Sequence, residues 1–176
     1  VSVLAIFLSF VFSLRIFLDF QTNFSANYYI HKYFEWFNLT HLDQVFKVEV
    51  GIYIDNLGSI MLLMVTGVAT LIHVFSTFYM ELDNRYGRFF TYLSLFTAAM
   101  IGLVLSDNLL TVFIFWELMG FCSYALIGFY TEKEKAGLAS MKAFLTTRVG
   151  DVIFLLGIMA IWGAIGSVGY VEIYNA

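Results

Sequence analysis

The sequence contains no proline, a single cysteine and few charged residues. Lys, Arg, Asp and Glu make up only 12% of the 176 residues, whereas 61% are hydrophobic. Soluble domains are typically about 45–50% apolar and about 25% charged. A core of this size cannot bury the excess, so the chain needs a lipid bilayer as its solvent. Without proline, its helices can run uninterrupted.

The scarcity of ligand residues excludes several classes of site. Cys122 stands alone and the three His residues do not cluster, so the sequence offers no ligand set for zinc, haem or an iron–sulfur cluster. We interpret Cys122 as a small buried residue of a helix. The net charge is −4 and no basic stripe is present, which excludes a nucleic-acid partner.

Five hydrophobic segments are long enough to cross a bilayer, which takes about 20 residues per helix. The predicted spans are 1–18, 57–80, 89–106, 109–130 and 138–165. Arg15 interrupts the first run and no small-residue cleavage site follows it, so we expect a membrane span there rather than a signal peptide. No linker or repeat is visible. We expect an all-α integral membrane fold, with residues 1–176 as one membrane domain.

The loop 19–55 is too long to be a bare connection. Its second half alternates, with Phe46, Val48, Val50, Ile52 and Ile54 on one side and Lys47, Glu49 and Tyr53 on the other. This period of two predicts a strand or β-hairpin on the membrane surface. The loop also holds an aromatic cluster, typical of the membrane–water interface, made of Tyr28, Tyr29, Tyr33, Phe34, Trp36 and Phe37.

The short loops predict the orientation, because Lys and Arg collect on the cytoplasmic or matrix side. Arg85, Arg88, Lys133 and Lys135 fall on one side of the five spans. The other side has Lys32 and Lys47 in the long loop and no basic residue in the tight reversal at 106–108, which makes its two flanking helices antiparallel neighbours. The loop 19–55 is therefore expected to face the periplasm or intermembrane space.

Glu117 is the most informative residue, because it lies inside the span 109–130, about 12 Å deep at 1.5 Å per residue. An acidic residue at such depth costs about 2.5–3.5 kcal/mol on insertion scales. The carboxylate can find a cation or take up a proton, and a group held between these states can carry protons. Gly120 and Gly128 on its face would admit another helix, and Tyr124 could supply a hydroxyl. The alternative is a permanently paired carboxylate that only packs helices.

The span 138–165 carries a second set of charges. Arg148 and Asp151 are three residues apart and can pair along one helix face, either in a proton route or as a static clasp. Lys142 points roughly the opposite way and either takes part in proton transfer or extends its ammonium group to the membrane edge. His73 lies at membrane depth, where it is either a titrating group or a packing residue.

These residues lie in motifs that resemble subunit 5 of NADH:ubiquinone oxidoreductase, respiratory complex I. The resemblance covers about residues 50–165. The motifs that carry it lie at 53–55, 66–68, 71–73, 88–90, 106–110, 115–130, 141–144 and 147–152. It implies an antiporter-like, proton-pumping membrane subunit. It places Glu117 at the family's channel glutamate, and Lys142, Arg148 and Asp151 on its charged helix. It also implies that Glu117 pairs with a lysine on a later helix, outside this chain.

The resemblance implies no cofactor in this chain, with flavin, iron–sulfur clusters and quinone in other subunits. The first span resembles the family's second helix, and the chain stops after the sixth, so we expect an N-terminal fragment or a split subunit. The expected partners are the rest of subunit 5, a neighbouring antiporter-like subunit and membrane lipids. A Mrp-type cation/proton antiporter subunit and a non-pumping scaffold fragment are the alternatives. The composition favours the mitochondrial inner membrane, with a bacterial plasma membrane as the alternative.

Overall fold

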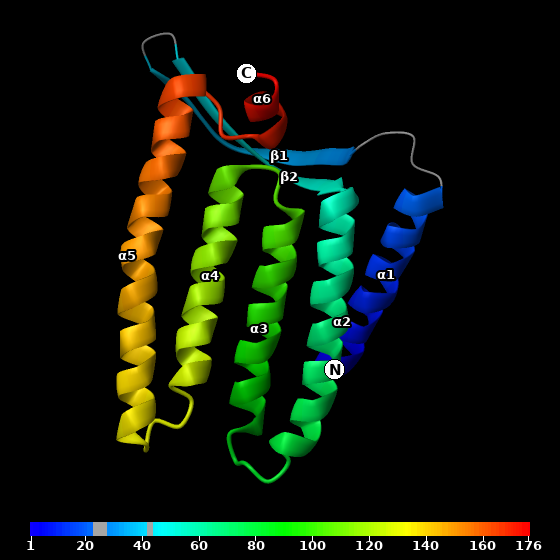
Figure 1. The fold of residues 1–176 in the computed structure, drawn as a ribbon, viewed down its shortest axis with the longest axis vertical. Coiled ribbons are helices and arrows are strands. Elements are labelled where there is room, and N and C mark those ends of the chain that lie inside the picture. Colours follow the sequence, from blue (N-terminus) through cyan, green and yellow to red (C-terminus); the bar gives the residue numbers. More distant parts are fainter. Residues whose placement is uncertain (23–27, 42–43) are drawn as a thin grey trace.

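The chain forms five long helices that stand side by side beneath a two-stranded β-hairpin (Figure 1). This computed structural model describes residues 1–22, 28–41 and 44–176, and it describes side chains outside 37–47. The predicted contributions of Phe37, Phe46 and Lys47 side chains therefore lie outside the described residues. The elements are α1 (Ser2–Thr22), β1 (Tyr28–His41), β2 (Gln44–Asp55), α2 (Asn56–Tyr79), α3 (Tyr86–Leu105), α4 (Leu109–Ile127), α5 (Glu134–Ile165) and α6 (Tyr170–Tyr174).

The five long helices, α1 to α5, confirm the predicted all-α membrane fold. Each is long and apolar enough to cross a bilayer. Many of their large apolar side chains remain exposed, as expected where lipid rather than water surrounds a helix bundle. Helix α5 begins at Glu134, four residues before the predicted span, because the charged turn that leads into it is already helical.

The predicted hairpin is also confirmed. Strands β1 and β2 pair antiparallel from Tyr28 opposite Asp55 to His41 opposite Gln44, with two irregularities in β1. The apolar side of β2 faces inward, since Val48 and Ile54 are buried. Asp55 then caps α2, its carboxylate accepting a hydrogen bond of 2.6 Å from the backbone N–H of Gly58.

The hairpin and α6 lie across one end of the bundle, and the α2–α3 and α4–α5 turns lie at the other (Figure 1). The basic residues of those two turns therefore share one side, as the orientation prediction requires. At the hairpin end, Val48, Ile158 and Val168 form a buried cluster with partly buried neighbours from α4 and α5. This cluster fixes the end of α5 to the hairpin.

Candidate functional site

Three charged side chains meet between α4 and α5 within the membrane-spanning part of the fold. Arg148 on α5 forms an ion pair with Glu117 on α4, and its Nη1 also lies 3.5 Å from Oδ2 of Asp151 on its own helix. The spacing of three residues on α5 places Arg148 and Asp151 on one face, as predicted. Arg148 thus gives Glu117 a cation within this chain, which was not predicted from the sequence, and the pairing of Glu117 with a lysine on a later helix stays a prediction.

Asp151 is the most enclosed member of this charged triad, which we define as Glu117, Arg148 and Asp151. The Asp151 side chain is 9% exposed, against 27% for Glu117 and 30% for Arg148. The indole N–H of Trp116 donates a hydrogen bond of 2.9 Å to Asp151 Oδ1. Each carboxylate oxygen of Asp151 therefore has a partner, the indole on one side and the guanidinium on the other.

A small cavity of about 140 Å³ borders the triad along the α4–α5 contact. Asp151, Trp116, Tyr124 and Thr147 contribute polar groups to its wall. The ring of Phe144 closes the same region, with the Arg148 guanidinium 4.4 Å above it. A cavity of this size can hold a few water molecules, which need polar partners of this kind.

Two of the other predicted site residues, Lys142 and His73, lie away from the triad. Lys142 is exposed on α5 and forms no ion pair with any described residue. His73 is 1% exposed; its Nδ1 lies 2.8 Å from the Ala69 carbonyl and its ring meets Phe90 edge-on. Those contacts are what a packing histidine requires. Tyr124 lines the triad cavity and packs against Phe144.

Only one of the two glycines predicted to admit a neighbouring helix does so within this chain. A Cβ at Gly128 would lie 2.9 Å from Ser140 Oγ, so α5 approaches α4 closely there. At Gly120 nothing described lies within 4 Å of such an atom. The close contact at Gly128 sets how α4 and α5 face one another and so brings the triad together.

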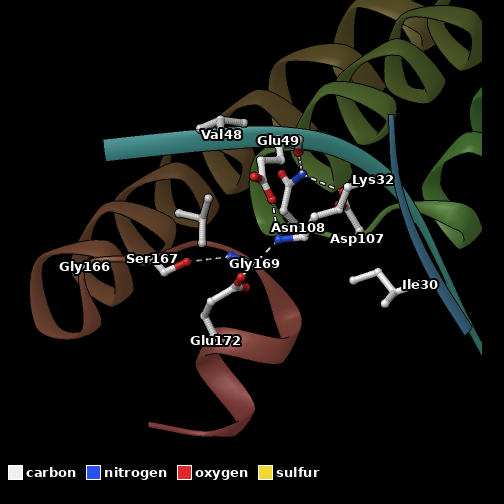
Figure 2. A pocket seen from close by; sticks show the side chains of 11 residues that line it. Ile30, Lys32, Val48, Glu49, Asp107, Asn108, Gly166, Ser167, Gly169 and Glu172 are labelled. Carbon is white, nitrogen blue, oxygen red and sulfur yellow. Dashed lines mark hydrogen bonds and ion pairs between the residues drawn. The ribbon is translucent and has the colours of Figure 1, made fainter. Parts of the chain in front are cut away.

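A polar junction outside the membrane part joins the hairpin, the 106–108 turn and the segment 166–169 (Figure 2). Asn108 is its centre. Its side-chain oxygen caps α4 by accepting from Thr111 N–H at 2.8 Å, and its amide nitrogen donates to the Glu49 carbonyl at 2.8 Å. The backbone of Leu109 donates to the Val168 carbonyl at 2.9 Å. Three segments distant in sequence thus become one unit.

Charged groups surround the cavity of about 340 Å³ in this junction (Figure 2). Lys32 pairs with Glu49 and, at 3.4 Å, with Glu172 on α6. The hydrogen bond with Glu49 raises the pKa of Lys32. Burial raises the pKa of Asp107, against the effect of hydrogen bonds from Asn108 and the Gly51 N–H. Lys32, Glu49 and Glu172 are ion-paired and Asp107 accepts hydrogen bonds, so the junction is a structural clasp.

Sequence reasoning did not find Trp116 or this clasp. Trp116 could have been found from its indole N–H, which lies inside an apolar span. Such a donor needs a hydrogen-bond partner when it is buried. The signal for the clasp was the run of three polar residues at 106–108, all of which are buried. Helix α6 and its contact with Lys32 gave no periodic signal, because the helix has only five residues.

Gly51 offers a test of the clasp. A Cβ at this position would lie 2.5 Å from Asp107 Oδ2 and 2.7 Å from the His31 carbonyl. We expect Gly51→Ala to lower the free energy of unfolding by about 1–3 kcal/mol, the usual cost of overpacking. Gly87→Ala is the matched control, because no atom of the described residues lies within 4 Å of its added atom. Thermal unfolding of the complex in detergent measures both. Equal stability of the two variants would contradict the close packing at Gly51.

Two family models match the chain. One, described as NADH-ubiquinone oxidoreductase (complex I), chain 5 N-terminus, matches residues 36–90. The other, described as NADH:quinone oxidoreductase/Mrp antiporter, transmembrane, matches residues 106–176. Together they include the 106–108 turn, the segment 166–169 and all three members of the triad.

Curated relatives agree with these matches. The chloroplastic NAD(P)H-quinone oxidoreductase subunit 5 of Nephroselmis olivacea is 50% identical over 132 residues, 75% of this chain and 20% of that protein. The one from Chaetosphaeridium globosum is 44% identical over 166 residues, 94% of this chain and 24% of that protein. The organellar chromatophore protein of Paulinella chromatophora is 52% identical over 122 residues, 69% and 18% of the two chains. This chain thus spans about a fifth of the length of these relatives.

Solved structures support the same fold. A chain of the archaeal membrane-bound sulfane sulfur reductase matches 98% of this chain with a TM-score of 0.75, at 17% identity and over 33% of its own length. A chain of the Mrp complex from Dietzia sp. matches 94% with a TM-score of 0.74, at 22% identity and over 17% of its own length. These likenesses concern the fold, and the sequence matches concern the family. The chain belongs to the subunit 5 family of the NAD(P)H:quinone oxidoreductases, the antiporter-like membrane subunits of complex I.

Proposed function

We propose that this chain contributes to proton translocation in the membrane arm of an NAD(P)H:quinone oxidoreductase. The observation that carries the proposal is the triad, in which one guanidinium lies between two carboxylates inside a membrane-spanning helix pair. Ionisable groups are expensive at this depth and usually mark ion or proton pathways. The family membership supplies the setting in which such a pathway would work.

The charges of the triad suit the storage of one proton. Arg148 stays protonated, because guanidinium groups do not lose their proton in proteins. Two ionised carboxylates and one guanidinium leave a net charge of −1, so one added proton makes the triad neutral. In a medium of low dielectric constant the neutral state is favoured. The proton can reside on Glu117 while Arg148 keeps its pairing with Asp151.

A second cation would then release the proton. The resemblance implies a lysine on a later helix as the family's partner of the channel glutamate. If its ammonium group approaches Glu117, the ionised carboxylate is stabilised and the proton leaves. Redox-linked changes elsewhere in the complex would drive that approach. In this scheme Arg148 is the ionic partner of Glu117 in the resting state. The lysine is the partner whose approach releases the proton.

We also propose that the redox reactions take place in other subunits of the complex. This chain supplies no redox centre, and flavin, iron–sulfur clusters and quinone belong to other subunits. Its partners are the rest of subunit 5 and a neighbouring antiporter-like subunit. The composition favours the mitochondrial inner membrane, whereas the names of the relatives favour a chloroplast-type membrane, which we adopt.

Purification of the intact complex through a tag on this chain tests the assignment. We expect flavin and iron–sulfur absorbance to co-purify with the chain, together with NAD(P)H oxidation by quinone. Proton uptake into proteoliposomes should depend on that oxidation and be independent of sodium. Absence of flavin from an otherwise intact complex would contradict the assignment.

A Mrp-type antiporter subunit is the second candidate, favoured by the fold likeness to the Mrp complex and by the family model that covers both groups. It predicts a flavin-free complex that exchanges sodium for protons. The same purification therefore separates the two functions. A scaffold without transport predicts co-purification with the redox subunits and a triad whose replacement leaves proton transport unchanged.

A further inference from the structure

A second cavity, of about 430 Å³, lies between α3, α4 and α5 at the bundle end opposite the hairpin. This end holds the α2–α3 and α4–α5 turns (Figure 1). The volume falls within the range of ligand sites in proteins. The cavity is separate from the triad cavity, although Tyr124 contributes to both walls. Neither the triad nor the clasp accounts for it.

Arg88 is the one charged residue among the described residues that line this cavity. Its side chain is exposed, and no described carboxylate lies within ion-pair distance of it. The neighbouring Arg85 differs, because Asp83 and Glu132 both pair with it. Arg88 therefore brings to the cavity wall a positive charge without a described carboxylate partner, its guanidinium lying 5.8 Å from the centroid of the Tyr92 ring.

The N-terminus of α3 adds to this positive potential. Arg88 lies in the first turn of α3, a helix of 20 residues with no acidic residue in that turn and no side-chain cap at Arg85. Helix α5 also begins at this end, but Glu134 lies in its first turn and α4 ends beside the cavity at Gly128, so these two helix ends add no net positive field. The positive charge that an anion meets here is that of Arg88 and the first turn of α3.

The rest of the wall carries both hydroxyl groups and apolar side chains. Thr131 and Tyr92 line the same wall as Arg88 and supply hydroxyl groups. Phe121 and Met141 supply exposed apolar surface on α4 and α5. A ligand that fits has an anionic group at one end and a hydrocarbon part at the other.

We propose that this cavity binds the head group of an anionic phospholipid, with the phosphate at Arg88 and an acyl chain along Phe121 and Met141. The cavity lies at a bundle end where head groups of a surrounding bilayer would be, and basic pockets between membrane helices on this side bind such lipids. A free phosphate would leave the apolar part of the wall uncovered. This assignment is independent of the proton-transfer role of the triad.

The test uses the complete complex, stripped of bound lipid by detergent and then supplied with a single lipid. Phosphatidylglycerol is expected to raise the thermal stability of the complex and to remain bound in native mass spectra. Phosphatidylcholine and inorganic phosphate are the comparison additions. Arg88→Gln should weaken phosphatidylglycerol binding about fivefold, the effect of one basic side chain near an anionic membrane surface.

Two control variants isolate the site. Lys135→Gln removes the same charge from the same end of the bundle, but Lys135 does not line the cavity. It should leave phosphatidylglycerol binding unchanged, and Arg88→Lys should retain most of it. Equal binding by Arg88→Gln and the unaltered complex would overturn the proposal. So would equal stabilisation by phosphatidylcholine, which shows no charge selectivity, or by inorganic phosphate, which shows that no lipid is required.

Discussion

Replacing Arg148 by glutamine is expected to destabilise the protein more than any other single change to the triad. It removes the cation from two carboxylates at once, since Arg148 contacts both Glu117 and Asp151. Breaking a buried ion pair by removing one partner costs about 3–5 kcal/mol, and the partial exposure of Arg148 favours the lower end. The two carboxylates that remain can reduce the cost only by taking up a proton. Thermal unfolding of the detergent-solubilised complex measures the loss.

Arg85→Gln is the matched control for that change. Arg85 also pairs with two carboxylates, but its partner Glu132 is 70% exposed. An exposed pair of this kind contributes at most about 1 kcal/mol. The double variant Glu117→Gln/Arg148→Gln should regain part of the stability lost in Arg148→Gln, because one unpaired carboxylate is gone. An Arg148→Gln variant as stable as Arg85→Gln would show that the triad contributes nothing to folding.

The helices could be predicted from the sequence because a bilayer leaves few alternatives. Long apolar runs without proline must form helices there, since every backbone N–H and C=O has to be satisfied within the segment. The hairpin could be predicted because apolar and polar residues alternate from Val48 to Ile54. This alternation indicates a strand with one buried face. Helix α6 could not be predicted, because its position depends on backbone hydrogen bonds to the 106–108 turn, such as Tyr170 N–H to the Asp107 carbonyl at 3.1 Å.

The triad could be predicted only in part. The pairing of Arg148 with Asp151 follows from spacing on one helix, which the sequence shows directly. The pairing of Arg148 with Glu117, and the hydrogen bond from Trp116 to Asp151, depend on how α4 and α5 are rotated toward each other. That rotation is set by contacts such as Gly128 against Ser140 and Phe113 against Phe154. No pattern within a single helix contains this information.

Replacing Glu117 by glutamine is expected to have the largest effect on transport and a small effect on folding. Glutamine keeps the shape of the side chain and can still accept a hydrogen bond from Arg148, but it cannot carry a proton. Arg148 retains Asp151 as its ionic partner, so no charge is left unpaired. Glu132→Gln is the control, because this exposed carboxylate lies outside the triad, paired with Arg85.

The ratio of protons translocated to NAD(P)H oxidised, measured in proteoliposomes that contain the Glu117→Gln complex, tests the central claim most directly. We predict a lower ratio than in the unaltered complex and in Glu132→Gln, with thermal stability close to that of both. An unchanged ratio at an unchanged rate of NAD(P)H oxidation would contradict a role for Glu117 in proton transfer.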